Sequence, residues 1–354
     1  MQPVVRNFDP KRILLILHGS IGDVIRALPL ASVLRKGFSQ SFIAWSVEPP
    51  SLPLLEHNAA IDEIMLFDRA HGWRALAPFL RQIRAKKFDL VLDLQRIFKS
   101  GFIGWASGAP RRLGFDRADA KEFNWIFNNL HIEPFGETIP KIEHYFKFAD
   151  YLGLPRGTPE WDFSLTADER SWVKLHLSRI HKPFAVLFVG TRWESKQWFP
   201  TQIARCAELL SDQYHLDIVL LGAKPDVQLA DEAVRESRTA VTNLVGDTSL
   251  REAIGIIELA KLTIGPDTGL MHIASAVGTP VISLWGATRP ERTGPYGYGD
   301  LVVQGRAPCV PCNRRRCKIG RICMQSITTE EIGQKIGLAL RRDRAKVVSH
   351  GEFV

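Results

Sequence analysis

Short apolar runs that alternate with helical patterns constrain this 354-residue chain more than any other feature of its sequence. The runs are rich in aliphatic residues and are bounded by turn residues, which predicts buried strands, and the stretches between them have helical periodicity. This alternation is typical of a parallel sheet covered by helices. The predicted strands are Arg12–Leu17, Phe42–Val47, Glu63–Phe67 and Phe88–Leu94, followed by Phe184–Val189, Leu216–Leu221, Leu262–Ile264 and Val281–Trp285.

The pattern restarts near the middle of the chain, after a segment rich in glycine and proline, Gly153–Pro159. Such a segment is a natural linker, and we place the domain boundary between residues 155 and 180. The predicted fold class is α/β, with two doubly wound, Rossmann-like lobes that face each other across a cleft. The expected domains are residues 1–165, residues 166–327, and a last helix with a basic tail over residues 328–354. Ligands of such sheets bind at the carboxyl ends of the strands.

Several helix boundaries can be predicted from capping residues. Thr166 with Glu169, Ser249 with Glu252 and Thr328 with Glu331 fit the capping box, in which two side chains satisfy free amides of the first turn. Helices are also expected over Trp73–Ala85 and Ile97–Ala106, and from about Pro200, Pro225 and Thr268. Pro29 conflicts with a helix that opens near Asp23, so that helix either kinks there or begins later.

Composition limits the class of protein and its partners. Hydrophobic residues make up 45% and charged residues 24% of the chain, as in a soluble globular protein. No apolar run reaches the roughly 18 residues of a membrane span, and the N-terminus has no secretory signal, so we expect a cytoplasmic location. Eleven basic and four acidic side chains lie between residues 300 and 346. Such a positive surface attracts nucleic acid, anionic lipid or an acidic substrate.

The loop after the first predicted strand has the sequence His18-Gly-Ser-Ile-Gly-Asp23. It lacks the third glycine and the later acidic residue of the dinucleotide fingerprint. Asp23 follows the carboxyl end of the strand and has two alternative roles. It either caps the next helix or removes a proton from an attacking hydroxyl.

The first strand of the second lobe leads into the loop Gly190–Trp198, which holds Thr191 and Lys196. Backbone amides, a hydroxyl and a cation are the groups that hold a diphosphate. The loop lacks the Gly-Lys-Ser/Thr ending of a P-loop, so it does not indicate an ATPase. The alternative is an ordinary solvated loop.

The segment Gly265-Pro-Asp267-Thr268-Gly269-Leu-Met-His272 joins a predicted strand to a helix. The first amides of such a helix favour a phosphate group. A carboxylate beside a diphosphate is repelled, so Asp267 either caps the helix or accepts bonds from sugar hydroxyls. His272 lies four residues after Thr268 and so shares its helical face.

In this order and at these spacings, the loops resemble the ADP-heptose glycosyltransferases of lipopolysaccharide core assembly, which have the two-lobed GT-B architecture. The resemblance extends from about residue 12 to residue 325. Its matching stretches are Ser20–Ile25 with Leu28-Pro29, Asp93–Gln95 with Lys99-Ser100, Lys196–Trp198, Asp267–Gly269 with His272, and Gly294–Gly297.

The resemblance implies a role for each loop. Asp23 is expected to be the general base, while Lys196 and the amides of Thr268 and Gly269 hold the donor diphosphate with help from Thr191. Contacts to the donor sugar or phosphate are expected from Asp267 and His272. Asp226 stands where the family often has a glutamate that contacts the nucleoside, and its shorter side chain puts that contact in doubt.

The resemblance also implies an inverting transfer of heptose from ADP-heptose, with no metal and no further cofactor. The expected acceptor is an anionic inner-core glycolipid, bound through Arg69, Arg74 and Lys99 at the cytoplasmic face of the inner membrane. His71, Arg81 and Arg84 are further basic residues of this region. The apolar residues of the same helix face either the core or a membrane surface; they are Leu76, Phe79, Leu80 and Ile83.

Four cysteines, Cys309, Cys312, Cys317 and Cys323, lie within an arginine-rich segment. Their spacing predicts either a structural zinc site or free thiols that stabilise a loop. Two alternatives to the heptosyltransferase therefore stay open. One is a GT-B glycosyltransferase that uses another nucleotide sugar, such as a UDP-sugar. The other is a basic, zinc-containing protein that binds nucleic acid, although no recognition motif accompanies the cysteines.

Overall fold

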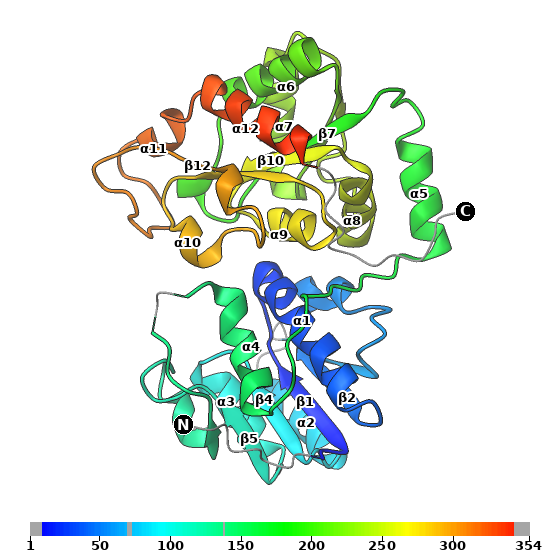
Figure 1. The fold of residues 1–354 in the computed structure, drawn as a ribbon, viewed down its shortest axis with the longest axis vertical. Helices are drawn as coiled ribbons and strands as arrows, with labels where there is room; N and C mark the ends of the chain where they lie inside the picture. The colour runs from blue at the N-terminus through cyan, green and yellow to red at the C-terminus, as the bar shows by residue number, and fades with distance from the viewer. Residues whose placement is uncertain (1–8, 69–72, 137–138, 343–354) are drawn as a thin grey trace. The chain divides into compact units, whose positions relative to one another are not determined.

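The structure is a computed structural model that describes residues 9–68, 73–136 and 139–342. The chain forms two compact units, Met1–Ser164 and Leu165–Val354, each with its own sheet and covering helices (Figure 1). Arg69, an expected acceptor residue, and His71, a further basic residue of that region, lie outside the described residues. The described residues include no helix that is both long and apolar enough to cross a membrane.

The first unit is built on a parallel sheet in the order β3-β2-β1-β4-β5-β6. Its strands are β1 (Arg12–Ile16), β2 (Phe42–Val47), β3 (Glu63–Leu66), β4 (Leu90–Asp93), β5 (Arg111–Gly114) and β6 (Leu130–His131). Its helices are α1 (Ile21–Gly37), α2 (Trp73–Ala85), α3 (Phe98–Ala106) and α4 (Lys141–Tyr151), with 3-10 turns η1 (Pro49–Leu54) and η3 (Asn124–Phe127). Phe79 and Ile83 are buried in the core beside β1, with Leu76 and Leu80 packed against it, which confirms the core-facing role of the α2 apolar face.

The second unit repeats the arrangement with a parallel sheet in the order β12-β11-β10-β7-β8-β9. Its strands are β7 (Phe184–Phe188), β8 (Asp217–Leu221), β9 (Val241–Asn243), β10 (Leu262–Pro266), β11 (Val281–Trp285) and β12 (Val302–Gln304). The longer helices are α5 (Ala167–His176), α6 (Pro200–Tyr214), α7 (Val227–Glu236), α8 (Leu250–Leu259), α9 (Gly269–Ala276) and α12 (Thr329–Arg341). Short turns of helix are η4 (Glu194–Lys196), η5 (Lys224–Asp226), α10 (Pro290–Thr293), η6 (Gly299–Leu301) and α11 (Ile322–Gln325).

The α/β fold class with two Rossmann-like sheets is confirmed, and each predicted strand is present within about two residues of its expected ends. The strands that the sequence did not predict are β5, β6, β9 and β12. Three of them form sheet edges, and all four are short. Short segments that are not fully buried lack the continuous apolar run that marks a central parallel strand.

The helix boundaries follow the capping residues. The capping boxes of Thr166 with Glu169, Ser249 with Glu252 and Thr328 with Glu331 are all present. Helix α1 begins at Ile21 and continues through Pro29. A proline at position 29 has no N–H to donate to the carbonyl of Ile25, four residues earlier. The indole Nε1 of Trp161 donates to that carbonyl instead, at 2.8 Å, so the helix tolerates the proline.

Glu169 closes its capping box and also forms an ion pair with Arg251 of α8, whose side chain is 5% exposed. The hydrogen bond from Arg251 outweighs the opposite effect of burial and lowers the pKa of Glu169 to about 2. A carboxyl group whose pKa falls on folding stabilises the folded state above its unfolded pKa. That contribution is lost as the pH falls through the folded value.

Glu169→Gln keeps the capping geometry but removes the charge, because glutamine also fits the box. We expect this variant to lower the melting temperature by about 2–4 °C at pH 7, with the difference from wild type shrinking as the pH falls from about 4.5 toward about 2. Thermal unfolding followed by circular dichroism measures this. Glu252→Gln is the matched control, since Glu252 closes a similar box without an ion pair among the described residues. A difference for Glu169→Gln that stays constant across this pH range contradicts the assignment.

Candidate active site

Each sheet has one place where its strand order reverses. In the first unit the chain runs outward from β1 to β3 and then returns to β4 beside β1; in the second it runs outward from β7 to β9 and returns to β10 beside β7. At such a switch point the loops after the two central strands separate and leave a crevice for a ligand. The sequence-predicted residues follow these strands: Asp23 after β1, Lys99 after β4, Thr191 and Lys196 after β7, and Asp267, Thr268, Gly269 and His272 after β10.

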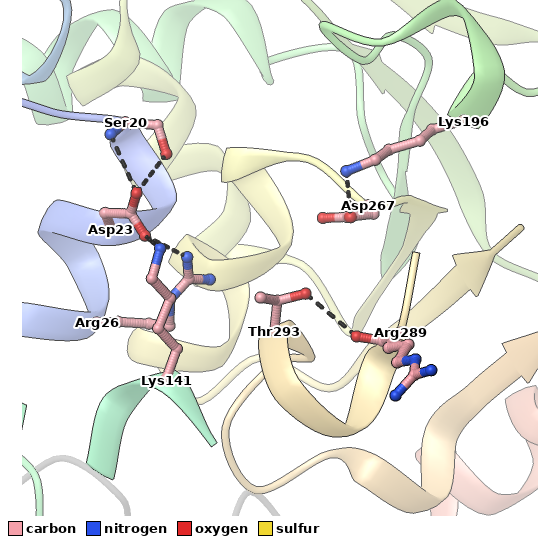
Figure 2. A network of polar contacts seen from close by, with 8 residues as sticks. All are labelled: Ser20, Asp23, Arg26, Lys141, Lys196, Asp267, Arg289 and Thr293. Carbon is pink, nitrogen blue, oxygen red and sulfur yellow. Dashed lines mark hydrogen bonds and ion pairs between the residues drawn. The ribbon is translucent and has the colours of Figure 1, made fainter. Parts of the chain in front are cut away.

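Asp23 lies in the first turn of α1, and its two carboxylate oxygens have different partners. Oδ2 accepts hydrogen bonds from the backbone N–H and the hydroxyl of Ser20, at 3.4 and 3.3 Å. Oδ1 accepts from Arg26 at 2.7 Å and from the ammonium group of Lys141, the first residue of α4. Figure 2 shows Ser20 on one side of the carboxylate and the ends of Arg26 and Lys141 on the other. Asp23 therefore takes part in a capping box as the third residue of α1, with Ser20 as the N-cap, and it uses only one of its two oxygens for this.

The charges around Asp23 determine its protonation. Burial raises the pKa of the carboxyl, but the positive charges of Lys141 and Arg26 and their hydrogen bonds outweigh burial and hold the pKa well below its usual range. Tyr145 of α4 is close enough to Asp23 for the charge of this carboxylate to add to the effect of burial, and both raise the pKa of the phenol. Asp23 is therefore an ionised carboxylate whose basicity is suppressed by two neighbouring cations.

The loop after β4 is held beside the loop after β1. The side chain of Gln95 accepts a hydrogen bond from the backbone N–H of His18 at 3.1 Å. Lys99 donates to Glu48 at 2.8 Å, and its ammonium group lies 5.0 Å from the ring centre of Phe67. The backbone of Arg74 lies in α2, but its side chain is outside the described part of the structure. Of the predicted acceptor residues, Lys99 alone has a described side chain.

In the second unit the loops after β7, β10 and β11 converge on Asp267. Its carboxylate accepts from the ammonium of Lys196 at 2.5 Å and from the hydroxyl of Thr288 at 2.8 Å. The hydroxyl of Thr191 donates to the backbone carbonyl of Asp267 at 2.9 Å. Lys196 also lies 4.2 Å from the ring centre of Trp193. Figure 2 shows Lys196 extended toward Asp267.

The N-terminus of α9 corrects one expectation. The N-cap residue is Thr268, and its side chain makes no capping hydrogen bond. Asp267 does not cap this helix, because it stands one residue before the N-cap, and its Oδ2 accepts from Lys196 and Thr288. Gly269 opens the helix, and His272 is 5% exposed within it. The backbone at Thr268 and Gly269 thus opens the helix directly after the Asp267 cluster.

Asp226 joins the same edge of the sheet from the loop after β8. Its carboxylate accepts from the backbone N–H of Ala223 at 2.9 Å, and burial raises its pKa in spite of that hydrogen bond. The carboxylate lies directly over Gly190, where an added Cβ would come within 2.0 Å of it. Only glycine at position 190 allows this close approach, which ties the loop after β8 to the end of β7.

The cysteine-rich segment packs on the loop that carries Lys196. The backbone N–H of Ser195 donates to the carbonyl of Arg315 at 3.2 Å, and the N–H of Cys317 donates to Glu194 at 2.9 Å. Arg321 donates to the carbonyl of Gln197 at 3.1 Å. Within the described residues no group of three or more histidine, cysteine, aspartate or glutamate side chains is arranged to hold a metal ion. The three hydrogen bonds hold the segment against the Lys196 loop.

The important residues that the sequence did not reveal are partners of predicted ones. Lys141 and Arg26 contact Asp23, and Thr288 contacts Asp267. Lys141 and Thr288 are far from these carboxylates in sequence, and no local motif marks them. Arg26 was visible as a basic residue one helical turn after Asp23, a spacing at which side chains meet.

Comparison with known proteins agrees with this geometry. The sequence profile of glycosyltransferase family 9 (heptosyltransferase) matches residues 76–323. The chain is 26% identical over 299 residues to the lipopolysaccharide core heptosyltransferase OpsX of Haemophilus influenzae, covering 83% of this chain and 84% of that protein. It is 24% identical to lipopolysaccharide heptosyltransferase 1 of Pseudomonas aeruginosa, covering 86% and 87% of the two chains.

Solved structures show the same fold. The glycosyl transferase family 9 protein of Veillonella parvula superposes with a TM-score of 0.82 at 20% identity, over 95% of this chain and 99% of that one. The E. coli heptosyltransferase WaaC with ADP gives a TM-score of 0.72 at 22% identity, over 93% and 99%. Fold and loops define a glycosyltransferase with the two Rossmann-like units of the GT-B fold. The chain belongs to glycosyltransferase family 9, the heptosyltransferases.

The electrostatics of Asp23 can be tested without substrate. Lys141→Met removes one of the two cations that oppose the effect of burial, so we expect the pKa of the Asp23 carboxyl to rise. Carboxyl ¹³C NMR titration measures this, with Asp23→Asn to assign the signal. Lys147→Met, on the same helix but near Phe135, is the matched control and should leave the titration unchanged. An Asp23 carboxyl that titrates alike in Lys141→Met and wild type contradicts the arrangement.

Proposed function

We propose that this glycosyltransferase moves heptose from ADP-heptose to the inner core of lipopolysaccharide, with a Kdo- or heptose-bearing lipid A as acceptor. The observation that carries this proposal is the pair of switch-point sites, one with a carboxylate in a cationic setting and one with a lysine beside a helix N-terminus. Relatives named as lipopolysaccharide heptosyltransferases, and the ADP bound in the WaaC structure, support the choice of substrates.

The second unit is proposed to bind the donor. Lys196 and the amides at Thr268 and Gly269 would hold the diphosphate, because a cation and a helix N-terminus both stabilise negative charge. Thr191 fixes the backbone of Asp267 and so positions the start of α9. The proposed contacts of Asp267 and His272 are with the donor sugar or phosphate, and that of Asp226 is with the nucleoside. Asp267 would also orient Lys196, which it holds at 2.5 Å.

The first unit is proposed to bind the acceptor, with Asp23 as the general base. A carboxylate paired with two cations is a poor base, since a base is most effective when its pKa lies near the working pH. An anionic acceptor would restore the basicity of Asp23, because its carboxylates or phosphates compete with Asp23 for Lys141 and Arg26. As these cations turn to the acceptor, the basicity of Asp23 rises beside the hydroxyl that it must deprotonate. Arg69, Arg74 and Lys99 would supply further positive charge.

The chemistry proposed is a single displacement. The acceptor hydroxyl oxygen forms a bond to the anomeric carbon, the bond from that carbon to the diphosphate breaks, and ADP leaves with the electron pair. The hydroxyl proton passes to Asp23, and the configuration at the anomeric carbon inverts. Lys196 and the N-terminus of α9 would balance the charge that develops on ADP, so we propose that no metal ion is required.

We further propose an acceptor domain over residues 1–165, a donor domain over residues 166–327, and a C-terminal helix with a basic tail over residues 328–354. The reaction then requires Asp23 and the start of α9 to share one cleft. The proposed location is the cytoplasm, with access to the cytoplasmic face of the inner membrane, where a lipid-anchored acceptor would be met.

Two substitutions separate the proposed roles. Asp23→Asn is expected to lower kcat by roughly 10²- to 10⁴-fold while ADP affinity changes little, because the base acts only on the acceptor. Lys196→Ala should weaken ADP binding by about tenfold or more, since a charge-assisted contact is lost. Mass spectrometry of the glycolipid product and calorimetry with ADP provide the measurements.

Lys261→Ala is the matched control for Lys196→Ala. Lys261 is exposed and lies just before β10, at the end of this strand opposite to Asp267 and Thr268. This variant should leave both ADP binding and transfer unchanged. Near-normal turnover by Asp23→Asn would remove Asp23 from the base role. ADP affinity that is equal in Lys196→Ala and Lys261→Ala would remove Lys196 from the diphosphate site.

The identity of the nucleotide can be tested through stability. A ligand that binds only the folded state raises the free energy of unfolding, by about 2.7 kcal/mol at 100 times its Kd. We expect ADP to raise the melting temperature of the wild-type protein by several degrees, and UDP at the same concentration to have little effect. Stabilisation by UDP and not by ADP would instead indicate a UDP-sugar as donor.

A further inference from the structure

The first unit presents an aromatic surface to solvent on α3 and η3. On α3 the residues at positions 98, 102 and 105 share one helical face, and the surface continues on η3 and on Phe123, the residue just before it. We call this surface the aromatic patch, and it consists of Phe98, Phe102, Trp105, Phe123, Ile126 and Phe127. Four of these side chains are largely exposed: Phe98 by 48%, Trp105 by 56%, Phe123 by 73% and Ile126 by 54%. A contiguous exposed surface of this kind marks an interaction site.

Four rings of the patch contact one another, those of Phe98, Phe102, Trp105 and Phe127. Phe98 meets Phe127 edge to face with ring centres 4.9 Å apart, and Phe102 lies 6.2 Å from Phe127 and 5.9 Å from Trp105. Gly101 allows η3 to approach α3 closely, since a Cβ at this position would lie 2.8 Å from Phe127. These four side chains are thus held in place by packing between the two elements.

A buried carboxylate anchors the patch from below. Asn124 of η3 donates to Asp93 at the end of β4, at 2.6 Å, and to the carbonyl of Ile97 just before α3, at 2.7 Å. Burial raises the pKa of Asp93 in spite of the hydrogen bonds that this carboxyl accepts. The rings therefore project from a rigid base that is continuous with the central sheet.

The exposed charged residues just before η3 are Arg117 and Lys121, which are basic, and Glu122, whose carboxylate accepts from the backbone N–H of Phe98 at 3.3 Å. Arg117 lies 5.1 Å from the ring centre of Trp125. The carboxylate of Asp119, by contrast, is buried and accepts from the backbone N–H groups of Phe135 and Gly136. Exposed aromatic rings bordered by cations complement a surface that is apolar below and anionic above, as at the headgroup level of a bilayer.

The patch also lies near the proposed acceptor site. Helix α3 leaves the carboxyl end of β4, which pairs with β1 in the register Ile16 with Asp93, and α1 with Asp23 leaves the carboxyl end of β1. The bond from the His18 N–H to Gln95 ties the two loops together. The Phe98 end of the patch therefore lies at the same edge of the sheet as Asp23.

We propose that the aromatic patch docks this enzyme on an anionic lipid bilayer, inserting the exposed rings of α3 and η3 while Arg117 and Lys121 meet the headgroups. This inference rests on the proposed function, because a lipid-anchored acceptor gives the enzyme a reason to bind the bilayer. It moves the membrane contact from the apolar face of α2, which is buried in the core, to α3 and η3.

Co-sedimentation of the full-length protein with lipid vesicles tests the proposal. The vesicles contain either phosphatidylcholine alone or phosphatidylcholine with phosphatidylglycerol. We expect wild type to bind the anionic vesicles, and the double variant Trp105→Ser with Phe123→Ser to bind them about tenfold less, since two large apolar groups no longer insert. Leu175→Ser in α5, which removes another side chain that is 68% exposed, is the matched control and should bind like wild type.

A second variant, Arg117→Glu with Lys121→Glu, keeps the rings and reverses the charges. It should lose the preference for anionic vesicles, and it provides an independent test if the aromatic variant does not fold. With a membrane-embedded acceptor, both variants should transfer sugar more slowly. With a deacylated, water-soluble acceptor they should match wild type.

The outcomes distinguish this inference from the proposed function. Vesicle binding that is equal in wild type and in both patch variants overturns docking through the patch, as does a wild-type protein that binds neither kind of vesicle. A wild-type dimer that the aromatic variant abolishes, with vesicle binding unchanged, identifies the patch as an interface between two copies and also overturns it. Failure of the wild type to transfer heptose to the deacylated acceptor counts against the proposed function, while vesicle binding is measured without any turnover.

Discussion

Both candidate sites depend on the parallel pairing of two central strands in each sheet. After one of these strands the chain continues toward one edge of the sheet, and after the other it continues toward the opposite edge. Because β1 pairs with β4 and β7 pairs with β10, the loops after these strands leave the same edge of their sheet and diverge. Asp23 and Lys99 follow the first pair, and Lys196 and Asp267 follow the second. In each unit the sheet thus places the candidate residues on loops that leave the same edge, although they are far apart in sequence.

Both sites hold a carboxylate against at least one cation. Asp23 accepts from Lys141 and Arg26, and Asp267 accepts from Lys196. Partly buried pairs of this kind keep each charge compensated and each side chain in place. They also leave cations poised near the positions where we propose anionic ligands bind. The first site would then gain a stronger base on binding its acceptor, and the second would gain a diphosphate clamp on binding its donor.

The sequence was most informative where one residue type has one structural consequence. Continuous apolar runs identified the central strands, and the three capping boxes located the starts of α5, α8 and α12. It was least informative where a contact joins distant segments. The Trp161 indole that takes over the carbonyl of Ile25 explains how α1 tolerates Pro29, and no local pattern contains it. The partners of the two key carboxylates have the same character, because Lys141 and Thr288 are brought in by tertiary packing. The family follows from the loops, while the residue roles stay predictions.

The central claim is that Asp23 and Lys196 serve the same reaction. Asp23 would deprotonate the hydroxyl that attacks the anomeric carbon, and Lys196 would bind the diphosphate that leaves it. A crystal structure with a non-transferable ADP-heptose analogue and a deacylated acceptor tests this claim most directly, through the distance from the Asp23 carboxylate to that carbon. A base that reaches a hydroxyl poised for attack must lie within about 6 Å of the carbon, the sum of one hydrogen bond and one near-attack contact. An analogue bound at Lys196 with Asp23 on a separate surface, and another base beside the acceptor hydroxyl, would contradict it.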